Sequence, residues 1–319
     1  MIQLDKAQIQ DLFDFETAVD AVRAAYVAFA QGRVQTPPVT YLGFPEVAGD
    51  CHVKSGHIAG DGAFVIKIAT GFYNNPAQGL PSSNGMNLVL SAETGAPLAL
   101  LQDEGWLTDI RTGIGGALAT HALAVAGFER FLIVGTGLQA RHQAQCLQQL
   151  VPDRRLAFSI WGRDAQKAKA VAQDLTAAGL LAQNTEDLPT ACKAAQAIVA
   201  TTPAQRHLIA RDWIGPGTHI TAIGADCPDK QELEAELTAH ADLLVCDSPE
   251  QALDHGEFQT LHKSGRLTEA DVVTLGDILS RDHQGRLNSS QITIADLTGL
   301  AAQDIAISQA TLKKLSAFE

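Results

Sequence analysis

FLIVGTGLQA, at residues 131–140, joins an apolar run to a glycine-containing turn, and a helical pattern from His142 to Leu150 follows. An apolar strand, a G-x-G-x-x-A turn and a helix in this order are typical of a dinucleotide-binding βα unit. The first glycine permits a tight turn, the second lets a pyrophosphate approach the backbone, and phosphates bind the free N–H groups of the helix N-terminus. The alternative is an ordinary strand–helix turn. The expected cofactor contacts are Gly135, Thr136, Gly137, Leu138, Gln139 and Ala140.

Composition places the chain among globular proteins with more than one domain. Its 319 residues are 46% hydrophobic and 18% charged, and 319 residues exceed one typical core. The net charge of −13 argues against nucleic acid or an anionic membrane surface as a partner. No segment is apolar enough to cross a membrane, and the first residues, MIQLDKAQIQDLF, lack the pattern of a secretory signal.

The five cysteines are scattered without a C-x-x-C spacing, and the ten histidines show no metal-binding spacing. We therefore expect no metal site and a cytoplasmic location.

The hydrophobic pattern changes near residue 120. Before it, after an amphipathic helix ending near Gly32, short strands follow one another with brief turns, which predicts an antiparallel meander: VTYLGF, CHVKSGHI, AFVIKIATGF, MNLVLSA and APLALL. After it, strands alternate with helices, which predicts a parallel sheet covered on both faces: FLIVG, AFSIWG, AIVATT, THITAIG, LLVCD, VVTLGD and ITIADL.

The expected fold class is therefore α/β, with a Rossmann dinucleotide-binding domain at residues 116–299 and a mixed α+β domain at 1–115. A last helix, expected at 301–315, is grouped with the first domain as residues 300–319.

Two cations stand out before residue 115. Lys67 lies inside an otherwise apolar strand, where a lysine is costly unless it is paired or faces a cavity. Arg111 begins a glycine-rich helical stretch and could grip a carboxylate or a phosphate. Thr112, which follows it, is assigned to the cofactor site. The alternatives are an outward-facing edge lysine and a surface ion pair. Lys54, flanked by His52, is a weaker candidate of the same kind.

Asp226 follows the strand THITAIG, in AIGADCPDKQEL. Ligands of open α/β sheets gather at the carboxyl ends of strands, so a carboxylate there could relay a proton or hold an ammonium group. A helix cap is the alternative. Thr201 ends another of these strands and is also assigned to the cofactor site.

The end of the second strand of this sheet bears on the choice of cofactor. An acidic residue there would bind the ribose 2′-hydroxyl, whereas IWGRD places Arg163 first and Asp164 second. An arginine accepts a 2′-phosphate. The cofactor is thus NAD or NADP, with a slight preference for NADP and Asp164 kept as a ribose ligand.

Four motifs in order make the chain resemble the ornithine cyclodeaminase/mu-crystallin family. They are VIKIATGFYNNPAQGLPSSNG, TGAPLALLQDEGWLTDIRTGIGGALATHALA, FLIVGTGLQA and GADCPDKQEL. The resemblance implies a homodimer joined through the N-terminal sheets, with a Rossmann domain inserted before a returning C-terminal helix. It assigns Lys67 and Arg111 to the substrate carboxylate, and Asp226 together with Lys67 to catalysis. It also assigns the segment of Asp296, Thr298 and Gly299 to the region of the nicotinamide, with Asp296 toward the cofactor and the other two toward substrate.

Within the family, GFYNNPAQGLPSSNG is closer to the ectoine-utilisation and iminosuccinate reductase branches than to ornithine cyclodeaminases. Many members carry an arginine in the first strands, but PPVTYL has none, and Lys54 with His52 appears instead.

Three functions stay open. The first is an NAD(P)H-dependent imine reductase, or amino-acid dehydrogenase, acting on a small α-imino acid. The second is a cyclodeaminase, a redox-neutral lyase that releases ammonia. The third is a mu-crystallin-like binding protein without catalysis. For the first, the leading substrate is iminosuccinate, reduced to L-aspartate, because Lys54, His52 and Ser82 could form a second anion site.

Overall fold

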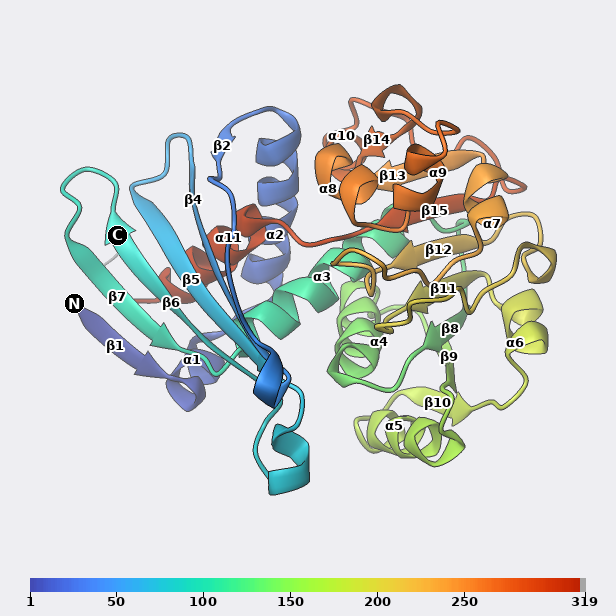
Figure 1. Cartoon of the computed structure of the whole chain (residues 1–319), viewed down its shortest axis with the longest axis horizontal. Helices are drawn as coiled ribbons and strands as arrows, with labels where there is room; N and C mark the ends of the chain where they lie inside the picture. Colours follow the sequence, from blue (N-terminus) through green and yellow to red (C-terminus); the bar gives the residue numbers. More distant parts are fainter. Residues whose placement is uncertain (316–319) are drawn as a thin grey trace. The chain divides into compact units, whose positions relative to one another are not determined.

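The computed structural model describes residues 1–315. The chain forms two compact units, one of Met1–Arg111 with the segment that begins at Leu300, the other of Thr112–Gly299 (Figure 1). Helix α3, Trp106–Leu123, runs across the boundary between Arg111 and Thr112. The sequence had suggested a boundary between residues 115 and 116, inside the same helix.

The first unit is built on a sheet in the order β1-β7-β6-β5-β4-β2, with β3 also paired to β4. The strands from β3 to β7 pair antiparallel, and β1 joins β7 in parallel. Their bounds are β1 Ile2–Asp5, β2 Val34–Gln35, β3 Thr40–Phe44, β4 Gly49–Ile58, β5 Ala63–Phe72, β6 Ser83–Ser91 and β7 Pro97–Gln102. The expected meander is present, whereas β1 was not anticipated.

One face of this sheet is covered by helices. Helix α11, Ala301–Leu312, packs on β4, β5 and β6 and against α2, Phe15–Ala30, while α1, Lys6–Leu12, packs near β1 and β7. Residues of α11 are buried on nearly all sides, Asp304 among them. A helix without a polar face needs partners all round, which explains why the end of the chain returns to the first sheet.

The second unit is a parallel sheet in the order β10-β9-β8-β11-β12-β15-β13-β14. Its core strands are almost wholly buried, as a sheet covered on both faces requires. The bounds are β8 Arg130–Val134, β9 Ala157–Trp161, β10 Leu181–Asn184, β11 Ala197–Ala200, β12 His219–Ala222, β13 Leu243–Cys246, β14 Val273–Thr274 and β15 Thr293–Asp296.

Seven helices within the described residues 1–315 accompany this sheet: α4 Leu138–Leu150, α5 Ala165–Ala177, α6 Leu188–Ala194, α7 Ala235–Ala239, α8 Pro249–Asp254, α9 Gln259–Lys263 and α10 Leu275–Ser280. The strand order reverses between β8 and β11, and the carboxyl edge at such a switch point is where open α/β sheets bind ligands. The α/β fold class with a Rossmann-type sheet is confirmed. Short β10 was missed because LAQN has no apolar run. None of the helices in residues 1–315 is long and apolar enough to span a bilayer.

Candidate active site

The turn between β8 and α4 contains two glycines with different roles. Gly135 has φ +139°, and a Cβ there would lie 2.1 Å from Thr201 Oγ1, so the fold itself requires glycine. Gly137 has an ordinary φ of −77° and would place a Cβ in open space. Gly137 starts α4 without a side-chain cap, which leaves the first N–H groups of the helix facing outward. Within residues 1–315, no atom lies within 4 Å of the place where a Cβ at Gly137 would stand, so packing does not require this glycine.

This turn lines a cleft of about 570 Å³ in the second unit. The cleft runs from Gly135, Thr136 and Gly137 to the end of β9 on one side and to the loop after β11 on the other. Thr201, placed here as expected, holds the turn by donating from Oγ1 to the carbonyl of Val134 at 3.3 Å. The size and position suit a dinucleotide, so the residues present fit the cofactor that the sequence suggested.

Three cations line the cleft. Arg163 and Lys167 lie after β9, next to Asp164, and Arg206 lies in the loop after β11. Asp164 caps α5, since its Oδ1 accepts from the N–H groups of Gln166 at 2.9 Å and Lys167 at 3.2 Å. The sequence missed Lys167 and Arg206, and it had kept Asp164 as a ribose ligand.

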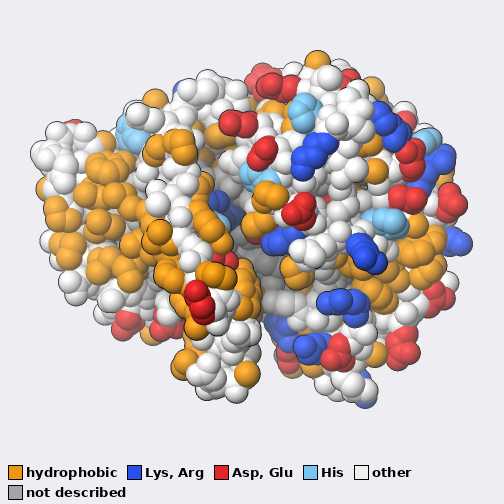
Figure 2. Space-filling view, in the orientation of Figure 1, with side chains coloured by type: hydrophobic (Ala, Val, Ile, Leu, Met, Phe, Trp, Pro, Cys, Tyr) orange, Lys and Arg blue, Asp and Glu red, His pale blue; other side chains and the backbone are white. Residues whose placement is uncertain are grey.

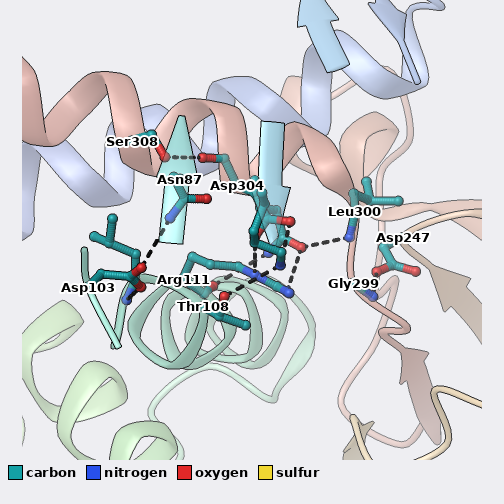
Figure 3. Close-up of polar contacts among 12 residues, drawn as sticks. Asn87, Asp103, Thr108, Arg111, Asp247, Gly299, Leu300, Asp304 and Ser308 are labelled. Carbon is teal, nitrogen blue, oxygen red and sulfur yellow. Dashed lines mark hydrogen bonds and ion pairs between the residues drawn. The ribbon is translucent and has the colours of Figure 1, made fainter. Parts of the chain in front are cut away.

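In the first unit, Lys67 and Arg111 meet at one buried carboxylate, that of Asp304 (Figure 3). Lys67 Nζ lies 2.7 Å from Asp304 Oδ2, and Arg111 Nε donates to Oδ1 at 3.0 Å. The three side chains are at most 8% exposed. The structure therefore brings together the two predicted carboxylate ligands, although they are 44 positions apart in β5 and α3.

Neighbouring polar groups fix this cluster. Gln303 accepts from Arg111 Nη1 at 3.2 Å, and its Nε2 donates to Tyr26 Oη at 2.9 Å. Lys67 Nζ also donates to Thr108 Oγ1 at 3.4 Å.

Asp103 accepts from Asn87 at 3.4 Å and from the N–H of Leu107 at 2.8 Å. Rigid cations in a buried place are suited to binding a carboxylate in one orientation.

Burial and mutual charge shift the ionisation of the cluster. Burial lowers the pKa of Lys67 to about 8, with Asp304 opposing the shift and Arg111 and Lys54 adding to it. Burial alone would raise the pKa of Asp304, but Lys67 and Arg111 outweigh it and hold that pKa below its usual value. Burial raises the pKa of Asp103. The cluster thus contains a lysine whose pKa of about 8 is well below the usual value for a lysine.

Lys54 lies directly opposite Lys67 in the β4–β5 pair and on the same face of the sheet. His52 shares that face but lies 3.6 Å from Asp50 and edge-on to Tyr41. Ser82 precedes β6 at the end of the β5–β6 hairpin where its loop lies, five residues from Asn87, the partner of Lys67, which is about 17 Å along the strand at 3.4 Å per residue. Lys54 joins the cluster by position, whereas Ser82 does not.

Asp226 lies in the loop after β12, as expected, with its side chain about half exposed. Its Oδ1 accepts from Lys230 Nζ at 2.5 Å. Burial by itself would lower the pKa of Lys230, but Asp226 outweighs it, and the pKa is raised. Lys230 was not singled out from the sequence, although its i, i+4 spacing from Asp226 was visible.

Three residues assigned by resemblance are held differently from what we expected. Asp296 is 1% exposed and its Oδ2 accepts from the N–H of Glu257 at 2.8 Å, so its carboxylate points into the core rather than toward a cofactor. Thr298 Oγ1 and the N–H of Gly299 both donate to Asp247, at 3.0 and 2.6 Å. Because Asp247 already binds these groups, they serve the protein's own loop in this conformation.

The remaining residues assigned to the cofactor site lie in the first turn of α4 or, for Thr112, in α3. The carbonyl of Thr112 accepts from Gln143 Nε2 at 3.0 Å, and the same nitrogen donates to Gln139 Oε1 at 3.3 Å. Leu138 is exposed and Ala140 is fully buried, as a residue that packs helix against strand must be.

A profile of the ornithine cyclodeaminase/mu-crystallin family matches residues 2–317. The chain belongs to this family. A protein of Sinorhizobium fredii called uncharacterized cyclodeaminase y4tK is 40% identical over 93% of the chain and 89% of its own length.

Two solved structures are similar over nearly their whole length. An archaeal alanine dehydrogenase dimer with bound NAD has a TM-score of 0.88 and 30% identity, covering 98% of this chain and 94% of that one. The iminosuccinate reductase of Paracoccus denitrificans in complex with NAD⁺ has a TM-score of 0.87 and 25% identity, covering 98% and 95%. Members of the ornithine cyclodeaminase/mu-crystallin family with this fold therefore include NAD-binding oxidoreductases.

Proposed function

We propose that this protein is an NAD(P)H-dependent imine reductase, or amino-acid dehydrogenase, that acts on a small α-imino acid. Two features of the structure support the proposal most strongly. One unit has a phosphate-binding turn whose Gly137 the fold does not need, and the other has Lys67 and Arg111 fixed on one buried carboxylate. An enzyme that transfers hydride from a dinucleotide to an α-imino acid needs a site for the cofactor phosphates and a site for the substrate carboxylate.

The bound cofactor supplies the hydride that reduces the imine carbon. Lys67 and Arg111 bind the α-carboxylate, and Asp304 and Gln303 keep the two cations in place. The imine nitrogen takes up its proton from water before the hydride is transferred, and the Asp226 carboxylate, oriented by the Lys230 ammonium, stabilises the resulting iminium. Orientation and charge stabilisation supply the rate, and no covalent intermediate is required.

The substrate in this proposal has a second carboxylate, with iminosuccinate reduced to L-aspartate as the leading case. Lys54, Lys67 and Arg111 face the carboxylates of Asp304 and Asp103, which leaves an excess of positive charge. Within residues 1–315, Lys54 has no ion pair with an acidic side chain. Like charges directly opposite each other in a sheet are unfavourable. A second substrate carboxylate would offset the excess of positive charge that Asp304 and Asp103 leave.

For the cofactor, the cations of the cleft favour NADP over NAD. Arg163 and Lys167 line the cleft after β9, and the carboxylate of Asp164 is engaged at the start of α5. A 2′-phosphate at that end would meet these two cations.

Assembly in this proposal is a homodimer joined through the first unit. The uncovered face of its sheet is apolar, whereas a solvated antiparallel face is normally polar. Ile68 and Met86, paired across β5 and β6, are each 37% exposed. Figure 2 shows hydrophobic side chains gathered over these strands. We place the protein in the cytoplasm because its five cysteines are all unpaired.

Steady-state oxidation of NADH and NADPH tests the reaction, with oxaloacetate plus ammonia against pyruvate plus ammonia. We expect faster turnover of the dicarboxylate and better use of NADPH. Lys54→Ala should raise KM for the dicarboxylate imine roughly 10-fold more than KM for the monocarboxylate imine. A factor of 10 corresponds to about 1.4 kcal/mol of binding free energy, which we expect from one lost charge contact. Lys169→Ala, an exposed lysine of α5, is the control.

Three results would contradict the proposal. Faster turnover of the monocarboxylate would remove the second anion site. Redox-neutral release of ammonia from ornithine would make the protein a cyclodeaminase. Binding of the dinucleotide without turnover of any substrate would favour a mu-crystallin-like binding protein.

A further inference from the structure

A hydrogen-bonded series of three buried carboxyl groups lies beneath the carboxyl edge of the second unit's sheet. Glu232 is fully buried, and Glu257 and Asp296 are each 1% exposed. Buried acids are rare unless they are paired, and none of the three forms an ion pair within residues 1–315. Each of them instead accepts hydrogen bonds from backbone N–H groups.

Glu232 joins two loops of the sheet edge. Its Oε1 accepts from the N–H of Thr202 at 2.6 Å and from Thr202 Oγ1 at 2.7 Å. Its Oε2 accepts from the N–H of Gly224 at 2.9 Å. Thr202 follows β11 and Gly224 follows β12. One carboxylate therefore binds the loops that follow two neighbouring strands.

These two loops are the ones that the proposed reaction needs. Thr202 lines the cofactor cleft, and Gly224 is two residues before Asp226. At Gly224, a Cβ would lie 2.1 Å from the carbonyl oxygen of Thr202 and 2.5 Å from Glu232 Oε2. The loops are thus in direct contact at the point where Glu232 binds them, and no side chain fits between them.

The other two acids hold Glu232 itself. Glu257 Oε1 accepts from the N–H of Glu232 at 2.5 Å, and Oε2 accepts from the N–H of Leu233 at 3.1 Å. Asp296 Oδ2 accepts from the N–H of Glu257 at 2.8 Å. The series runs from the end of β15 to the ends of β11 and β12, and each carboxylate fixes the backbone that carries the next.

We propose that Glu232 is a positioning residue for the reduction, because its carboxylate fixes the loop that carries Asp226 against the loop that lines the cofactor cleft. This inference rests on the proposed function for its catalytic consequence. The tether itself is independent of the reaction and is testable without turnover.

Protonation of Glu232 should release part of the tether. The carboxylate accepts all three of these hydrogen bonds. A proton bound to Oε2 would point at the N–H of Gly224 and would take the place of that hydrogen bond. Burial raises the pKa of Glu232 to about 7, with Thr202, Gly224 and Lys230 opposing the shift. The charged groups that face it are Lys230 from its own loop and Glu257 from the segment after α8. Burial also raises the pKa of Glu257, to about 8, and Glu232 adds to that rise.

The first experiment measures amide hydrogen exchange in the full-length protein. In Glu232→Gln, the amide of Thr202 or that of Gly224 should exchange faster than in the wild type, because the NH2 group that replaces one carboxylate oxygen cannot accept its hydrogen bond. Glu234→Gln is the control, since Glu234 accepts from Arg211 instead. Unchanged exchange at both amides in Glu232→Gln overturns the tether.

The second experiment follows kcat against pH. The wild type should lose activity below about pH 7, and Glu232→Gln should lower kcat at pH 8 roughly 10- to 100-fold and abolish the acid limb, as displacement of a catalytic group by about 1 Å does. Binding of NADPH should change much less than kcat, and Glu234→Gln should behave as wild type. A wild-type kcat and acid limb in Glu232→Gln refute the positioning role. Absence of turnover in every variant, with faster exchange in Glu232→Gln, refutes the proposed function but not the tether.

Discussion

At the scale of single residues, Lys67 links the structure most directly to a measurable pH dependence. It must be protonated to bind a carboxylate, and burial lowers its pKa to about 8. Since a lysine with a lowered pKa loses its charge as pH rises through that value, kcat/KM should fall above about pH 8. An arginine stays charged over this range, so Lys67→Arg should lack the alkaline limb even if its maximum is lower.

The pH profile of kcat/KM checks this prediction. Lys54→Arg is the matched control, because it changes the neighbouring cation on β4 and leaves Lys67 in place. The limb should persist in this control. An alkaline limb in Lys67→Arg that coincides with that of the wild type would show that another group titrates.

At the scale of elements, the β8–α4 turn separates a glycine needed by the fold from one needed by a ligand. Gly137→Val should leave the thermal unfolding temperature close to that of the wild type, because its Cβ meets open space, and it should abolish dinucleotide binding. Gly135→Ala should instead destabilise the protein, because its Cβ would overlap Thr201 at a positive φ.

Calorimetric unfolding and titration of the tryptophan fluorescence with NADPH measure the two effects. Normal affinity in Gly137→Val would exclude a pyrophosphate on this turn. Equal loss of stability in the two variants would show that Gly137 is required by the fold as well.

At the scale of the whole molecule, the apolar face of the first sheet predicts the oligomeric state. Ile68→Asp should convert a dimer to a monomer, because a carboxylate on that face cannot be desolvated without a partner. Leu181→Asp makes the same kind of change at a residue that is 50% exposed on β10 of the other sheet, and it should leave the dimer intact. Light scattering during gel filtration measures the mass. A monomeric wild type would contradict this prediction.

Local patterns were sufficient for most of the fold. The strand, turn and helix around Gly135 and Gly137 and the alternating strands of the meander all follow from short-range periodicity and turn chemistry. The same patterns missed β1 and β10, which have four residues each and depend on neighbouring strands for their formation.

The partners of the candidate site needed the tertiary structure. The sequence by itself determined that Lys67 must be paired or face a cavity, because an isolated buried ammonium is too costly. Only the tertiary structure decided that its partner is Asp304, which lies 237 positions later on the returning helix, and that Asp296 faces the core. Periodicity reports which residues share a face, whereas an ion pair between distant elements depends on how those elements pack. That packing is set by the total burial of the chain rather than by any local signal.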